Sequence, residues 1–144
     1  MSFTIQQIRD AQSKVKTGAD FPAFVQELIN LGVRIYDTFV SDGHTIYEGL
    51  DGSRMDSGPK YDSLKVSFQR GSKQFRNYLQ MHQQGKTDFG TFCKHAAETG
   101  VEKWKVDMLQ MTCTYYNQAG EKMLEEQIPI PTTDHGRQTT KTDD

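Results

Sequence analysis

The apolar residues of the chain follow two different periods, and each period occurs twice. Around residue 25 they recur every three to four positions, as on the buried stripe of an amphipathic helix: Phe21, Phe24, Val25, Leu28 and Ile29. Asp20 before this stripe is a favourable N-cap, and Gly32 after it can take the left-handed conformation that closes a helix. The same spacing returns after Asp88 and ends at Gly100, with Phe89, Phe92, Cys93, Ala96 and Ala97 on the stripe. The pattern predicts two equivalent helices.

A further helix is predicted before each of these two. Thr4-x-x-Gln7 has the form of a capping box and is followed by a stripe of Ile5, Ile8, Ala11 and Val15. Ser72 can cap the counterpart, whose stripe is Phe75, Tyr78, Leu79 and His82.

After each glycine the period changes from that of a helix to the two-residue period of a half-buried strand. In the first half, residues 33–40 and 44–48 flank the turn signal Ser41-Asp42-Gly43, and residues 64–68 are predicted as a third strand. In the second half, the predicted strands are 101–109, 112–117 and 122–127. The order α-α-β-β-β then α-α-β-β-β predicts an α+β fold with helices packed on one side of an antiparallel sheet.

The two halves also match each other in sequence. An offset of 68 residues aligns Asp20-Phe21-x-x-Phe24 with Asp88-Phe89-x-x-Phe92, and Gly32-Val33 with Gly100-Val101. It also pairs Tyr36 with Trp104 and Tyr47 with Tyr115. We interpret the match as an internal duplication, with pseudo-repeats at about 3–70 and 71–131.

Composition limits the extent of the fold and the classes of partner. Residues 132–144 contain no apolar side chain, so we predict a disordered polar tail after a single domain of residues 1–131. A net charge of −2 and the lack of a long apolar segment or a signal region argue against a membrane protein and make nucleic acid an unlikely partner. The two cysteines show no paired framework, which favours reduced thiols and a cytoplasmic location.

Several stretches resemble a known family. They are HQQGKTDFGTFC at 82–93, AETGVEKWKVD at 97–107 and MTCTYYN at 111–117, followed by EQIP at 126–129. Together they resemble the YdfO/YbcV-like (DUF1398) family of uncharacterised bacterial proteins, some of them carried on prophages and some labelled phage envelope protein. The resemblance covers nearly all of residues 1–131 and implies a cytoplasmic bacterial α+β domain. It implies no catalytic residue, cofactor or substrate.

Three groups of residues could carry chemistry, and each has a simpler structural interpretation. Cys93-x-His95 lacks the spacing of a zinc site, so we predict neither a metal nor a cofactor. A small enzyme could use Cys113 and Asp107 with His44, although nothing local would activate the thiol. Residues 60–76 hold five Lys or Arg and one Asp, and Arg70, Lys73 and Arg76 could contact an anion or a nucleic acid.

The aromatic residues that the offset exchanges are the strongest candidates for function. If the halves pack about a pseudo-twofold axis, Tyr36, Tyr47, Trp104 and Tyr115 line one central seam. They can be core, or they can form a ligand cleft or a contact with a second copy of the chain, because Tyr and Trp combine apolar area with one polar group. The sequence therefore favours a non-enzymatic binding or interaction protein. The small enzyme and a nucleic-acid adaptor using residues 60–76 remain the alternatives.

Overall fold

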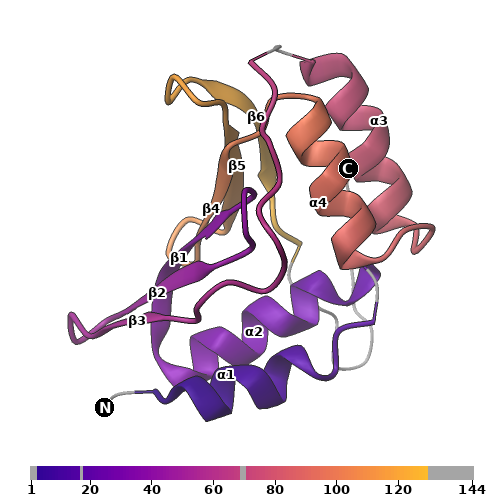
Figure 1. Ribbon diagram of the computed structural model, residues 1–144. Coiled ribbons are helices and arrows are strands. Elements are labelled where there is room, and N and C mark those ends of the chain that lie inside the picture. Colours follow the sequence, from indigo (N-terminus) through magenta and orange to yellow (C-terminus); the bar gives the residue numbers. More distant parts are fainter. Residues whose placement is uncertain (1–2, 17, 69–70, 130–144) are drawn as a thin grey trace.

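A computed structural model describes residues 3–16, 18–68 and 71–129 (Figure 1). The first half contains α1 (Ile5–Gln12), a short 3-10 helix η1 (Gly18–Asp20), α2 (Phe21–Leu31), β1 (Val33–Phe39), β2 (Thr45–Gly49) and β3 (Arg54–Asp56). The second half contains α3 (Ser72–Gln83), α4 (Phe89–Glu98), β4 (Lys103–Asp107), β5 (Thr112–Tyr116) and β6 (Lys122–Gln127). The predicted α+β class and element order are confirmed.

All six strands form one sheet in the order β3-β2-β1-β4-β5-β6, and every neighbouring pair is antiparallel. The two halves therefore join at its centre, where β1 pairs with β4. The register of this pair places Tyr36 opposite Val106 and Thr38 opposite Trp104. A shift of 68 residues converts one of these pairs into the other, so the central junction is symmetric in register.

The helices cover one face of this sheet in two pairs. Figure 1 shows α1 beside α2 and α3 beside α4, both pairs on the same side of the strands. The strand residues that face the helices are buried, as the alternating pattern in the sequence predicts. Side chains from both halves thus share one apolar layer.

Helix ends follow the predicted caps in part. Thr4 and Gln7 form the predicted capping box, and Gly32 closes α2 with φ 97°. Asp20 is the N-cap residue of α2 as predicted, although its side chain makes no capping bond and its Oδ2 accepts from the Lys16 amide. The prediction for Ser72 is wrong, because Ser72 is the first residue of α3 and Gly71 is its N-cap. Asp88, which precedes α4, does cap it, by accepting from the Thr91 amide.

The predicted strand at 64–68 is wrong. The third strand of the first half is β3, much earlier in the chain, and residues 64–68 belong to an irregular connection that leads to α3. The backbone of this connection bonds to other elements: the Leu64 amide donates to the Ser41 carbonyl and the Ser67 amide to the Ala97 carbonyl. This packing buries Val66. The alternation of apolar residues at 64–68 therefore reflects contact with the core, and not pairing with a neighbouring strand.

Two further predictions concern the thiols and the end of the chain. Cys93 and Cys113 are both buried and free, as predicted. The predicted disordered tail at 132–144 lies outside the described residues. In the part of the chain that the structure describes, no helix has the length and apolar character needed to cross a membrane.

Candidate functional site: a cavity between the two halves

A cavity of about 870 Å³ lies between the helices and the sheet and is lined by both halves of the chain. Many of its lining residues are related by the 68-residue offset: Phe21 and Phe89, Phe24 and Phe92, Tyr36 and Trp104, Thr45 and Cys113, Tyr47 and Tyr115. The cavity therefore follows the same internal symmetry as the register of the sheet.

The floor of the cavity consists of two adjacent rows of side chains that run across the strands. One row is Thr45, Thr38, Trp104, Tyr115 and Leu124. The next row is Tyr47, Tyr36, Val106, Cys113 and Glu126. Because these positions alternate with outward-facing ones, both rows point to the helix side of the sheet.

The structure brings the four predicted aromatic residues together on this floor. Tyr36 and Tyr47 are cross-strand neighbours with ring centroids 5.4 Å apart, and Trp104 and Tyr115 are the equivalent pair at 6.0 Å. All four are at most 6% exposed, so their rings belong to the interior of one chain and not to a surface between subunits. They are core residues that also border the cavity.

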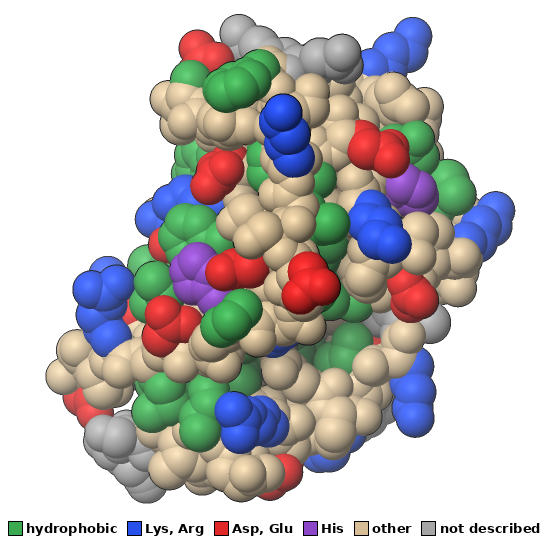
Figure 2. Space-filling view, in the orientation of Figure 1, with side chains coloured by type: hydrophobic (Ala, Val, Ile, Leu, Met, Phe, Trp, Pro, Cys, Tyr) green, Lys and Arg blue, Asp and Glu red, His purple; other side chains and the backbone are tan. Residues whose placement is uncertain are grey.

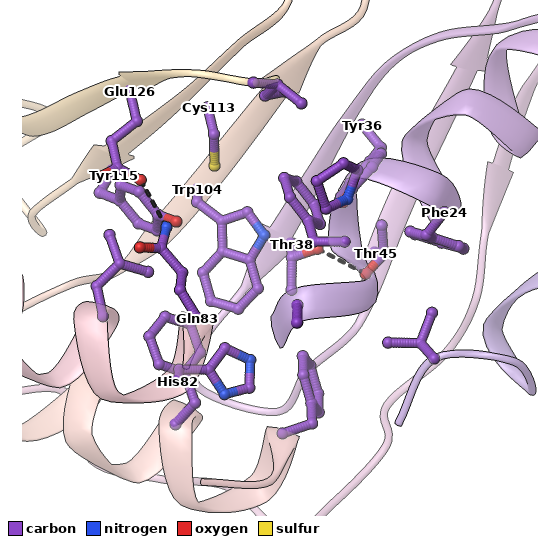
Figure 3. A pocket seen from close by; sticks show the side chains of 18 of the residues that line it. Phe24, Tyr36, Thr38, Thr45, His82, Gln83, Trp104, Cys113, Tyr115 and Glu126 are labelled. Atoms are coloured by element: carbon purple, nitrogen blue, oxygen red, sulfur yellow. Dashed lines mark hydrogen bonds between the residues drawn. The ribbon is translucent and has the colours of Figure 1, made fainter. Parts of the chain in front are cut away.

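Polar groups on the floor are poor in partners. Gln12 Nε2 donates to the Tyr47 hydroxyl at 3.1 Å, and the hydroxyls of Thr38 and Thr45 bond to each other at 2.9 Å. Within the described residues, the Trp104 indole N–H and the Tyr36 hydroxyl have no such bond. Figure 3 shows the indole nitrogen on the ring edge turned toward Thr38. The floor thus offers unused hydrogen-bond donors next to aromatic faces.

Burial keeps the phenols and the cavity thiol protonated. Desolvation raises the pKa of Tyr47 to about 12 and the pKa of Tyr36 and Tyr115 well above their usual value. Desolvation likewise raises the pKa of the Cys113 thiol to about 12, and the Glu126 carboxylate adds to the effect. These groups can therefore donate hydrogen bonds at neutral pH, and none of them is a ready nucleophile.

Polar side chains of α3 and β6 form one part of the cavity wall. Gln83 Nε2 donates to Glu126 Oε1 at 2.8 Å (Figure 3). His82 stacks on Phe92 with centroids 4.4 Å apart, and its Nδ1 lies 3.1 Å from the carbonyl and hydroxyl oxygens of Thr87. Desolvation lowers the pKa of His82, so the neutral ring is favoured.

Cationic side chains border the cavity elsewhere: Lys16, Lys60 and Arg76. All three residues are exposed. The Lys60 ammonium lies over the Phe89 ring, 5.5 Å from its centroid, and desolvation there lowers the pKa of Lys60. Within the described part of the chain, Lys60 forms no ion pair with a carboxylate.

The predicted anion-contact residues are not gathered into one patch. Arg76 borders the cavity, Lys73 is exposed on the first turn of α3, and Arg70 lies outside the described residues. On the face in Figure 2, Lys and Arg side chains are dispersed among acidic ones. That arrangement does not favour a continuous contact with a nucleic-acid backbone.

The structure does not bring Cys113, Asp107 and His44 together. His44 precedes β2, stacks on Phe39 and has Nδ1 2.6 Å from Asp42 Oδ1. Asp107 Oδ1 accepts from the amides of the turn after β4, on the opposite sheet face from the Cys113 side chain. Three strand spacings, about 14 Å, separate the His44 end of β2 from β5.

Metal-ligand types are scattered as well. Across residues 3–16, 18–68 and 71–129, no group of three or more His, Cys, Asp or Glu side chains could hold a metal ion. Cys93 and His95 are separated by the curvature of α4, and His95 stacks on Tyr78 with centroids 3.8 Å apart.

Sequence reasoning missed the polar boundary of the cavity. Glu126 and His82 each had a usable signal, because both lie at positions where the strand or helix period turns them inward. Lys60 belongs to the basic segment 60–76 for which the sequence suggests an anion or nucleic-acid contact, but no period places it beside the cavity, because it comes from the irregular connection after β3.

Comparison with known proteins gives a family and no activity. No curated protein matches the chain. A family model described as "Protein of unknown function (DUF1398)" matches residues 9–127, a segment that includes the second half of α1 and every later helix and strand. This agrees with the resemblance in the sequence, and the chain belongs to the DUF1398 family.

Proposed function

We propose that this protein is a small-molecule-binding module that holds a ligand in the cavity between its two halves without transforming it. The observation that carries the proposal is the cavity itself. Its volume of about 870 Å³ falls in the range that accommodates small organic ligands, and its walls are aromatic with few polar groups. Rings such as Trp104 and Tyr36 provide apolar contact, while their N–H and O–H groups can orient the ligand.

The chemistry of the cavity supports binding more than catalysis. The thiol on its floor, Cys113, is protonated because burial raises its pKa. His82, the histidine among the described residues that border the cavity, bonds to Thr87 and stacks on Phe92. An acid, a base and a nucleophile within reach of one another are the usual requirement for hydrolytic or transfer chemistry.

The setting we propose is the bacterial cytoplasm, in a chain of prophage origin. Free thiols at Cys93 and Cys113 suit a reducing compartment. The family resemblance supports the bacterial and prophage assignment.

The two thiols provide a test with an internal control. Cys113 borders the cavity, whereas Cys93 is buried on α4 beside Tyr61 and does not border it. Cys93→Ser leaves Cys113 as the sole thiol, and Cys113→Ser leaves Cys93 as the sole thiol. The measurement is the rate of modification by methyl methanethiosulfonate with and without the neutral apolar dye N-phenyl-1-naphthylamine.

We expect the dye to slow modification of Cys113 about tenfold at ten times its Kd, because only the unliganded protein reacts. Modification of Cys93 should change little. Equal rates at Cys113 with and without a bound dye, or equal protection of both thiols, would contradict the proposal.

A further inference from the structure

Several hydrogen-bonding groups around the cavity can only donate, and this bears on the class of ligand. An indole N–H and an ammonium can only donate. The Tyr47 hydroxyl accepts from Gln12, which leaves its proton free to donate, and the Tyr36 hydroxyl has no partner among the described residues. A ligand that pairs with Trp104 and Lys60 must supply acceptor atoms, which the two phenol hydroxyls can also donate to.

Lys60 and Trp104 both border the cavity and share one neighbouring ring. Both lie against Phe89: the Lys60 ammonium is 5.5 Å from its ring centroid, and the Trp104 ring meets it edge-on at 6.3 Å. Lys60 lacks a carboxylate partner within the described residues, and removal of water from its ammonium disfavours the charge. An anion on the ligand would compensate this charge.

The charged side chains around the cavity carry a small excess of positive charge. Lys16, Lys60 and Arg76 border it, whereas Glu126 is the acidic side chain that faces it and already accepts from Gln83. Glu125 also borders the cavity, but its carboxylate accepts from Thr114 and pairs with Lys122. The local excess of positive charge contrasts with the net charge of −2 for the whole chain.

We infer that the ligand is a small carboxylate with an apolar, preferably aromatic, body. The carboxylate lies at Lys60 and accepts from the Trp104 indole N–H, and the apolar body packs between the rings of Tyr36, Tyr47 and Phe92. This inference rests on the proposed function, since it names the ligand class of the same cavity.

The test compares three probes of the same shape: 3-phenylpropionate, its neutral amide and the cationic 3-phenylpropylamine. Trp104 is the single tryptophan of the chain, so its fluorescence reports binding directly. Two variants complete the design. Lys60→Met removes the ammonium with little change in length, and Lys65→Met is the matched control, an exposed lysine of the same connection that does not border the cavity.

We expect the wild type to bind the carboxylate at least about tenfold more tightly than the amide, and the amine most weakly. Lys60→Met should reduce the preference for carboxylate over amide to near one while the Kd of the amide changes little. Lys65→Met should keep the preference.

The inference is overturned if the amide or the amine binds as tightly as the carboxylate, or if Lys60→Met retains the preference. Failure of all three probes, with Cys113 still protected by N-phenyl-1-naphthylamine, overturns the carboxylate inference and leaves the binding proposal standing. Loss of that protection as well overturns both.

Discussion

At the scale of single residues, the interior rings have two roles at once. Tyr36 and Trp104 are nearly inaccessible to solvent, yet each presents an unpaired donor to the cavity. Because both groups border the cavity, water or an acceptor on a ligand can complete their hydrogen bonds.

His82 makes the stability of the protein depend on pH. Desolvation lowers the pKa of folded His82 below the unfolded value of about 6.5, so in this range the unfolded chain binds more protons than the folded one. We expect the free energy of unfolding to be highest above about pH 6.5 and to fall as the pH drops through that value toward the lower folded pKa.

His82→Gln should flatten this dependence. The measurement is urea unfolding at about pH 7.5, 6.5 and 5.5 for both proteins, at constant ionic strength. The same slope of unfolding free energy against pH in the variant and the wild type would contradict the assignment of this effect to His82.

The residues of the cavity could be predicted from the sequence only where a period or the offset constrained them. The offset placed Tyr36, Tyr47, Trp104 and Tyr115 in one region because paired strands must keep their register. It could not indicate whether helix side chains would fill the space above those rings. Lys60 escaped prediction because its position depends on the path of an irregular connection.

At the scale of elements, two glycines set the change from helix to strand. Gly32 follows α2 with φ 97°, and Gly100, just beyond α4, has φ 95°. An L side chain in this left-handed region costs about 1–2 kcal/mol. These two positions therefore fix the direction in which β1 and β4 leave their helices.

Alanine substitution at these two glycines should lower the free energy of unfolding, whereas alanine substitution at a glycine inside a helix should raise it. Gly32→Ala and Gly100→Ala should each lower the free energy of unfolding by about 1–2 kcal/mol. Gly90→Ala, in the first turn of α4, is the control: an added Cβ would meet only Asp88 Oδ1, at 3.9 Å, and stability should rise by up to about 1 kcal/mol. Chemical denaturation measures all three, and a stabilising Gly32→Ala would contradict the role given to that glycine.

Most elements were predictable because a local signal specified each of them. The helix stripes and the turn at Ser41-Asp42-Gly43 are short-range features of the sequence. The third strand of the first half was misplaced because β3 has only three residues, too few for a two-residue period to stand out. The apolar residues at 64–68 show a clearer two-residue period than β3 does. They are apolar because they pack against α4 and the turn after β1, and not because they pair as a strand.

At the scale of the whole molecule, the apolar layer is thin because it is divided around a cavity. The sheet is continuous across both halves, so each half supplies part of the core of the other. This explains how a chain with 35% hydrophobic residues folds around an internal space.

Deletion of residues 132–144 should leave the melting temperature unchanged to within about 1 °C, since that segment has no apolar side chain to bury. Differential scanning calorimetry of the chain ending at residue 131 measures this. A drop of several degrees would show that the segment packs on the fold.

The central strand pair has a consequence for how the two halves depend on each other. Asp37 lies opposite Lys105, and these positions are equivalent under the 68-residue shift. Two copies of the first half assembled in the same way would place two carboxylates opposite each other, and two copies of the second half would place two ammonium groups there. Like charges in that position are destabilising. The charges at this position therefore favour the mixed pairing of the two halves over the pairing of either half with its own copy.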